Sequence, residues 1–130
     1  MSVILGIESS CDDTGIGIVE DGCRILVNDI SSQIDTHATF GGVVPEIASR
    51  MHTTVISQMV DHALSKIDHP LDAIAYTNGP GLMGSLLVGA NFAKAFAFAR
   101  NLPAIPIHHI EGHIFSAFLQ GSPPEFPCLV

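Results

Sequence analysis

The order of its apolar segments most constrains how this chain can fold. Three short apolar runs come first, over residues 3–7, 15–19 and 23–30. The first run is consistent with a buried strand, and apolar residues alternate with their neighbours in the third. Asp21-Gly22, between the second and third runs, is typical of a two-residue β-hairpin turn. The sequence therefore predicts that the chain opens as a three-stranded antiparallel meander.

Strands and helices alternate through the rest of the chain. The expected elements are a helix over 45–67, a strand over 71–76, a helix over 85–100, a strand over 104–107 and a helix over 114–120. Residues 31–42 show no period and predict a loop. We expect His52 and His62, inside the first helix, at the surface or at an interface rather than as metal ligands. The predicted fold class is α/β, a meander followed by two strand–helix units.

Two histidines follow the last predicted strand. His109 and His113 are four residues apart, so their imidazoles share one face if a helix begins near His109. Such a face can offer two nitrogen ligands to a metal ion. Glu111 lies between them as a candidate partner of a ligand histidine or a general base. Histidine pairs at this spacing also occur without a metal, and the spacing alone leaves that alternative open.

A polar turn lies between the first two predicted strands, over residues 8–15. A loop of small residues between paired strands can hold a phosphate with backbone N–H groups and hydroxyls. Asp12 and Asp13 are candidates to hold a metal-bound phosphate or to position a nucleophile. The alternative is a solvated hairpin in which these residues only form the turn.

A glycine-rich segment joins the strand at 71–76 to the following helix. Gly79, Gly81 and Gly84 satisfy the pattern G-x-G-x-x-G, which supports a dinucleotide-binding alternative. Against it, the next strand ends in histidines, and the chain begins with a meander rather than with this motif. A helix N-terminus after a glycine turn is a good anion site under either interpretation.

Small residues recur along the helix predicted over 85–100. Ser85, Gly89, Ala93 and Ala97 lie at intervals of four and let another backbone approach closely. That backbone is either the chain's own sheet or a partner helix. Asn91 and Lys94 in the middle of the helix, together with its modest length, argue against a membrane span.

Composition restricts the partners and the compartment. The net charge of −8 gives no general field that attracts phosphate backbones, so nucleic acid would bind through another subunit or a local patch. The chain is 47% hydrophobic and only 14% charged, which suggests that a partner or another domain covers part of its surface. Three cysteines without a C-x-x-C spacing, and no signal peptide, favour a reduced cytoplasmic protein.

The last residues read as a boundary between two structural units. Residues 121–127 are rich in proline and glycine and resemble a linker, and residues 128–130 read as the start of a fresh strand. We therefore expect one lobe over 1–121, and over 122–130 a linker with the first residues of a second lobe. The chain would then be the front half of a longer protein.

Four segments resemble the universal tRNA threonylcarbamoyltransferase family, formerly called O-sialoglycoprotein endopeptidases. They are GIESSCDDT (6–14), VPEIASR (44–50), NGPGLMGSLLVG (78–89) and HIEGH (109–113), in the same order over almost the whole chain. The resemblance implies an actin-like, sugar-kinase-like fold of two lobes with a nucleotide between them. This chain would be the N-terminal lobe, with a ribonuclease-H-like core. The protease name gets no support, because the glutamate of HIEGH is misplaced for H-E-x-x-H.

The resemblance also implies a reaction and its site. Threonylcarbamoyl would pass from threonylcarbamoyl-AMP to N6 of adenosine 37 in tRNAs that read codons beginning with A. One iron or zinc ion per subunit would be held by His109 and His113, with an aspartate of the second lobe as third ligand. The residues implied for catalysis or proton transfer are Asp12, Asp13 and Glu111, and those implied for substrate contact are Ser9, Ser10, Cys11, Gly79 and Gly81. With half a site, we expect neither tight adenylate binding nor turnover by the chain alone.

Partners follow from the same resemblance. A non-catalytic paralogue of the TsaB type would pack against the helices over 45–67 and 85–100, and an ATPase subunit of the TsaE type would complete the assembly. The tRNA and threonylcarbamoyl-AMP would be the substrates, and no membrane would be involved. The paralogue lacks the histidine pair, so the pair favours the catalytic member. A non-catalytic interaction lobe of the same fold stays open as an alternative.

Overall fold

The computed structural model, which describes residues 1–119, 121 and 123–129, contains one mixed sheet of five strands in the order β3-β2-β1-β4-β5. The strands are β1 (Val3–Glu8), β2 (Thr14–Glu20), β3 (Arg24–Ser31), β4 (Ala73–Gly79) and β5 (Ala104–His108). The first three pair antiparallel, and β4 and β5 run parallel to β1. The predicted meander and the α/β class are confirmed.

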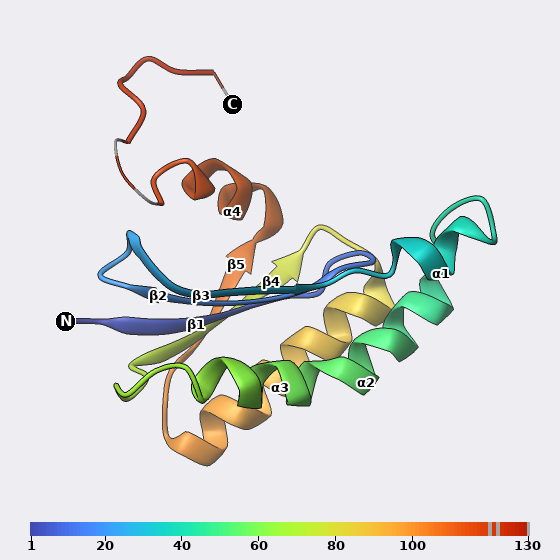
Figure 1. The fold of residues 1–130 in the computed structure, drawn as a ribbon, viewed down its shortest axis with the longest axis horizontal. Helices are drawn as coiled ribbons and strands as arrows, with labels where there is room; N and C mark the ends of the chain where they lie inside the picture. Colours follow the sequence, from blue (N-terminus) through green and yellow to red (C-terminus); the bar gives the residue numbers. More distant parts are fainter. Residues whose placement is uncertain (120, 122, 130) are drawn as a thin grey trace.

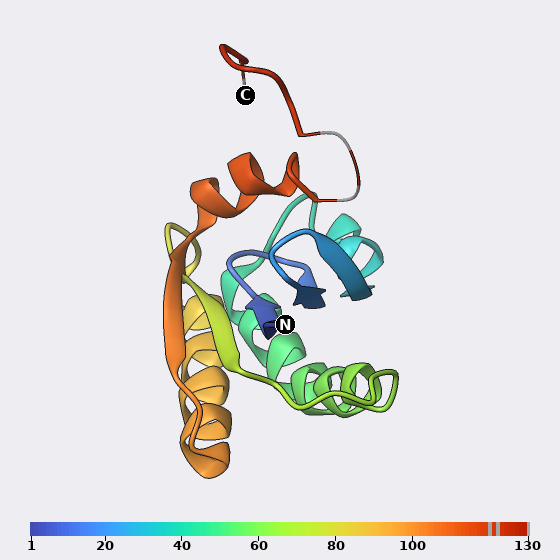
Figure 2. The same cartoon turned by 90° about the vertical axis from the view of Figure 1, so that its left-hand side faces the viewer.

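The helices lie on both faces of the sheet. They are α1 (Ile34–Ala38), α2 (Pro45–Leu64), α3 (Met83–Arg100) and α4 (His109–Ser116). Figure 1 shows α2 and α3 below the sheet and α4 on the opposite side, and Figure 2 shows the same layers from the side. Within the described ranges, no helix combines the length and the apolar character that a membrane span requires.

Strand periodicity decides which side chains reach each face. In β1 and β2 every second residue is buried, as expected where one face of a sheet is covered by helices. Ile7 and Ser9 face α3, because both lie within 4 Å of the position that a Cβ on Gly89 would take. Glu8, between them, therefore points to the opposite face. The core lies between the sheet and the helices α2 and α3.

The predicted loop over 31–42 is wrong at its centre, where α1 forms. His37 on α1 is buried; its Nδ1 accepts the Val44 N–H at 3.2 Å, and its Nε2 lies 2.8 Å from Gln33 Oε1. The contact with Val44 joins α1 to the start of α2, and the contact with Gln33 holds α1 to the residue that precedes it. A helix of five residues is too short to show a hydrophobic period, so the sequence pattern could not reveal it.

His52 corrects a second expectation. Its side chain is 0% exposed, whereas His62 is exposed as expected. His52 Nε2 donates to the carbonyl oxygen of Cys11 at 2.9 Å, because that oxygen can only accept. Nδ1 of the same ring then accepts the Thr14 hydroxyl at 2.7 Å. A buried histidine with both nitrogens bonded thus ties α2 to the β1–β2 loop.

The small-residue stripe of α3 packs inside the chain. Ser85, Gly89, Ala93 and Ala97 are all buried. A Cβ on Gly89 would lie only 2.2 Å from Ser9 Oγ, so the glycine allows α3 to approach the end of β1. The stripe is therefore covered by the chain's own sheet, and a partner helix cannot use it.

The remaining differences concern boundaries. The helix predicted over 45–67 ends at Leu64, and the strand predicted over 71–76 occupies Ala73–Gly79. The last helix starts at His109 and ends at Ser116, and residue 120 of the predicted helix lies outside the described residues. Cys128 and Leu129 do not form the predicted strand, and residue 130 again lies outside the described residues.

Candidate metal site at the ends of the parallel strands

Three neighbouring parallel strands end at one edge of the sheet. Ile7 of β1 pairs with Tyr76 of β4, and Thr77 of β4 pairs with Ile107 of β5. This register places Glu8 beside Thr77 and brings the residues after β5 to the same edge. The carboxyl ends of such strands are where open α/β sheets place their functional groups.

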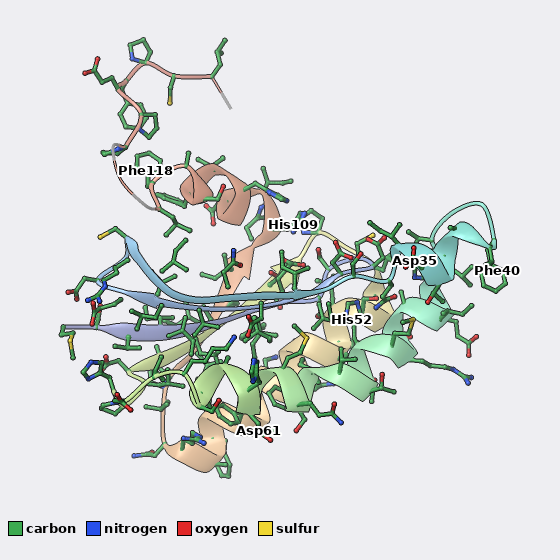
Figure 3. All side chains as sticks on the ribbon, viewed as in Figure 1. Asp35, Phe40, His52, Asp61, His109 and Phe118 are labelled. Atoms are coloured by element: carbon green, nitrogen blue, oxygen red, sulfur yellow. The ribbon has the colours of Figure 1, made fainter. Side chains whose placement is uncertain are left out.

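The histidine pair occupies this edge. His108 caps α4, because its Nδ1 accepts the Ile110 N–H at 3.2 Å, so His109 is the first helical residue. His113 follows one turn later, and the two Nε2 atoms lie 3.1 Å apart. Figure 3 shows His109 at the start of α4, on the opposite side of the sheet from His52. The prediction that both imidazoles share one face is confirmed.

The separation of the two nitrogens fits one metal ion. Nitrogen ligands at about 2.0–2.1 Å from an ion, at angles between those of octahedral and tetrahedral sites, lie about 2.8–3.4 Å apart. The observed 3.1 Å falls inside that range. In the described part of the chain, no group of three or more His, Cys, Asp or Glu side chains gathers to hold an ion. By this separation His109 and His113 could offer two nitrogen ligands to one ion.

Glu8 is the site residue that sequence reasoning missed. Its Oε2 lies 3.2 Å from His109 Nδ1 and accepts the Thr77 hydroxyl, and its Oε1 accepts the Ser10 N–H. Burial raises the pKa of Glu8, but the hydrogen bonds from Ser10, Thr77 and His109 outweigh burial and hold the pKa below its usual value. An ionised carboxylate therefore adjoins the first histidine. The alternation of β1 was the available signal, because it puts Glu8 on the open face.

A cavity of about 530 Å³ separates the open face of the sheet from α4. Glycines of β1 and β2 form part of its floor, and Gly112, His113 and Ser116 of α4 contribute to its other wall. Glu8 and His109 also line it. The histidine pair thus opens onto a space large enough for a small substrate group.

Residues 24–130 match the family described as tRNA N6-adenosine threonylcarbamoyltransferase. The chain belongs to this family. A protein of that name from Dehalococcoides mccartyi is 57% identical over 129 residues, which cover 97% of this chain and 40% of the relative. A protein of the same name from Carboxydothermus hydrogenoformans is 51% identical over 129 residues, which cover 98% of this chain and 39% of that relative. The chain therefore spans about 40% of the length of these threonylcarbamoyltransferases.

Solved structures confirm the fold expected for this chain. YeaZ from Pseudomonas aeruginosa has a TM-score of 0.62 at 20% identity, over 82% of this chain and 45% of YeaZ. T. thermophilus RuvC, solved with a Holliday junction substrate, has a TM-score of 0.52 at 12% identity, over 85% of this chain and 67% of RuvC. Both likenesses support a ribonuclease-H-like lobe of the actin-like class.

The β1–β2 loop carries most of the other candidate residues. Ser10 is closest to the pair, with Oγ 3.2 Å from His109 Nδ1. Ser9 is buried and donates its hydroxyl to the Ser85 carbonyl at 2.8 Å, so it faces α3 rather than the cavity. Among the described residues, no hydrogen bond joins Asp12 or Asp13 to either histidine of the pair. Cys11 is exposed, and partial desolvation of its thiol, followed by the effect of Asp12, raises the pKa of that thiol.

Glu111 faces a different cavity from the histidine pair. It lines a smaller cavity of about 360 Å³ together with Asn78 and Gly79, whereas His109 and His113 line the larger one. In the described part of the chain, no hydrogen bond links Glu111 to either of these histidines. The structure therefore separates Glu111 from the pair that brackets it in the sequence.

The glycine-rich segment has the predicted strand–turn–helix context, between the end of β4 at Gly79 and the start of α3 at Met83. The backbone of the β1–β2 loop packs against this turn. The Leu82 N–H donates to the Ser10 carbonyl at 2.7 Å, and a Cβ on Gly81 would lie 2.5 Å from the same oxygen. Gly81 thus admits the β1–β2 loop rather than a pyrophosphate, which removes the main support for dinucleotide binding.

Proposed function

We propose that this chain is the N-terminal, metal-binding lobe of a tRNA N6-adenosine threonylcarbamoyltransferase. The whole enzyme would transfer threonylcarbamoyl from threonylcarbamoyl-AMP to N6 of adenosine 37 in tRNAs that read codons beginning with A. The observation that carries the proposal is the histidine pair, with Nε2 atoms 3.1 Å apart, in a chain of this family. Residues 1–121 would form the lobe, and 122–130 would lead into a second one.

The pair would hold iron or zinc with an aspartate of the second lobe as the third ligand. Bound there, the ion would act as a Lewis acid toward the threonylcarbamoyl carbonyl. Glu8 and Ser10 orient the ring of His109 through Nδ1 and leave Nε2 for the ion. The cavity beside the pair would receive the threonylcarbamoyl group.

The transfer step is an acyl transfer to an amine. A bond forms between N6 and the carbamoyl carbon, and the bond from that carbon to the phosphate oxygen of the adenylate breaks. AMP leaves, and the amine gives up one proton to a base. Asp12 and Asp13 are our candidates for this role because their loop contacts the site through Ser10. Glu111 is the third candidate, from the adjoining cavity, where Gly79 also lies.

Substrates and partners would approach from different sides. The net charge of −8 implies that the second lobe and the partners bind most of the tRNA. A TsaB-type paralogue would cover the outer surfaces of α2 and α3, where Met83, Leu87 and Phe98 are exposed. A TsaE-type ATPase would complete the assembly. A tRNA substrate of this kind places the enzyme in the cytoplasm.

The test uses a hybrid protein in which this chain is followed by the remaining residues of the Dehalococcoides mccartyi relative. Modified adenosine is measured in tRNA after incubation with threonylcarbamoyl-AMP and the partner subunits. We expect transfer by the hybrid, a loss of about 100-fold or more in His109→Ala/His113→Ala, and no loss in His69→Ala, an exposed histidine. Full activity of the double variant would refute the proposal. Transfer by the chain alone would refute the half-site.

A further inference from the structure

The hydrogen bonds of Glu8 fix where the protons of the histidine pair lie. An ionised carboxylate can only accept hydrogen bonds. Glu8 Oε2 is 3.2 Å from His109 Nδ1, so that nitrogen carries the proton. A neutral imidazole has one N–H, and His109 Nε2 is therefore bare.

The same argument continues to the second ring. Because His109 Nε2 is bare, its contact of 3.1 Å with His113 Nε2 requires the proton to sit on His113. Without a ligand, the two rings are therefore in opposite tautomers. His109 Nε2 accepts a hydrogen bond, and His113 Nε2–H donates it.

We propose that Glu8 is a positioning residue that presets His109 in the Nδ1–H tautomer, and that His113 must change tautomer before both Nε2 atoms can bind one cation. The cation is the one named in the proposed function, on which this part of the inference rests. The tautomers themselves rest only on the contacts of the chain without a ligand. A carboxylate that accepts the other N–H of a ligand histidine is a recurrent way to orient such a ring.

The Glu8 carboxylate is firmly positioned because residues of three different segments donate hydrogen bonds to it. Ser10 N–H binds Oε1, and the Thr77 hydroxyl shares Oε2 with His109. Thr77 is itself buried, so the carboxylate has a fixed partner on β4. Glutamine has only one acceptor oxygen, so Glu8→Gln can satisfy Ser10 or His109, but not both.

The tautomers are measured on the metal-free chain by long-range proton–nitrogen NMR correlations of the imidazole rings in mildly alkaline buffer. We expect a protonated Nδ1 for His109 and a protonated Nε2 for His113 in the wild type. Glu8→Ala should release His109 into a mixture of tautomers. Thr77→Val keeps the carboxylate and loses one of its donors, so its effect should be smaller. Glu46→Gln, on an exposed glutamate of α2, is the matched control and should change neither ring.

A zinc titration of the hybrid protein provides the second readout. We expect zinc to convert His113 to the Nδ1–H tautomer and Glu8→Ala to weaken zinc binding by about 10–100-fold. A wild-type His109 protonated at Nε2, or an unchanged His109 in Glu8→Ala, would overturn the inference. Failure of the proposed function is distinguishable, because it would appear as no zinc binding to wild-type hybrid whatever the tautomers of the metal-free chain.

Discussion

Two carboxylates, one at the end of β1 and one in the loop that follows it, act on their neighbours in opposite ways. Glu8 is kept ionised by the donors around it and in turn orients His109. Asp12 instead disfavours the negative charge of the adjacent Cys11 thiolate. The first effect joins β1 to β4 and α4, whereas the second lies between adjacent residues of the β1–β2 loop, and each can be measured at a single residue.

Asp12→Asn should make Cys11 more reactive. The thiolate is the nucleophile, and partial desolvation, followed by the hydrogen bond and charge of Asp12, raises the pKa of Cys11. Removal of the Asp12 charge lowers that pKa, so alkylation at a given pH below it becomes faster and the rate profile moves to lower pH. The rate is measured by iodoacetamide labelling of the Cys11 peptide as a function of pH.

Asp13→Asn is the matched control, because Asp13 is the weakest of the contributors to the shift in the pKa of Cys11. Its pH–rate profile should move less than that of Asp12→Asn. An equal or larger shift in the control would contradict the loop geometry.

Prediction from sequence succeeded where the signal was local. His109 and His113 were found because their spacing of four residues becomes one face of a helix. Glu8 and Thr77 were missed because their contact joins residues 69 apart, through the register of β1 against β4. No pattern within either strand states that register. His52 was misplaced for the same reason, since its partners lie on another element.

At the scale of elements, the strands and the longer helices were predictable because their apolar periods repeat several times. α1 was not, because its five residues are held by His37 and Gln33 rather than by a hydrophobic face. The turn from β4 to α3 was predictable as a glycine turn, but not its occupant, the Ser10 backbone. Contacts between elements depend on tertiary packing, which a local sequence pattern does not indicate.

His52→Leu should destabilise the tie between α2 and the β1–β2 loop. Leucine fills similar space but leaves the Cys11 carbonyl and the Thr14 hydroxyl without their partner. We expect a loss of about 1–3 kcal/mol in the free energy of unfolding, measured by urea denaturation. His62→Leu, at an exposed position of the same helix, should change it by less than about 0.5 kcal/mol. Equal effects would contradict the assigned role.

Gly89→Ala should separate α3 from β1. The added Cβ would meet Ser9 Oγ at 2.2 Å, so Ser9 must turn away from Ser85 or the helix must move. We expect a loss of about 1–3 kcal/mol in the free energy of unfolding. A Cβ on Gly112 of α4 meets nothing within 4 Å, so Gly112→Ala should be neutral or stabilising.

A double variant sharpens the Gly89 test. Ser9→Ala removes the hydroxyl that the new methyl group would meet, so it should recover part of the loss caused by Gly89→Ala. Denaturation of the single and double variants gives the coupling between the two positions. Strictly additive losses would show that α3 and β1 do not touch there.

At the scale of the whole molecule, the chain presents two different surfaces. The cavity lies against the face of the sheet away from α2 and α3, and His109 and His113 line it. Figure 1 shows α4, which carries both histidines, on that side. The outer side of α3 exposes apolar side chains such as Leu87, which is 50% exposed. The family resemblance assigned the two long helices, one of which bears the second surface, to contact with a paralogue.

Leu87→Glu should weaken binding of a TsaB-type paralogue. A charge on the exposed centre of an apolar contact must be desolvated, and the expected loss of affinity is about 10-fold or more. Calorimetric titration of the hybrid protein with the paralogue measures the affinity. His69→Glu places the same charge at another exposed position and should have no such effect. Unchanged binding by Leu87→Glu would move the interface away from α3.

The metal content of the hybrid protein tests the central claim most directly. Purified wild type and His109→Ala/His113→Ala are analysed for iron and zinc by mass spectrometry, before and after exposure to either metal. The account predicts about one ion per chain in the wild type and almost none in the double variant. Equal metal in both proteins, or none in either, would contradict a metal site built on this pair.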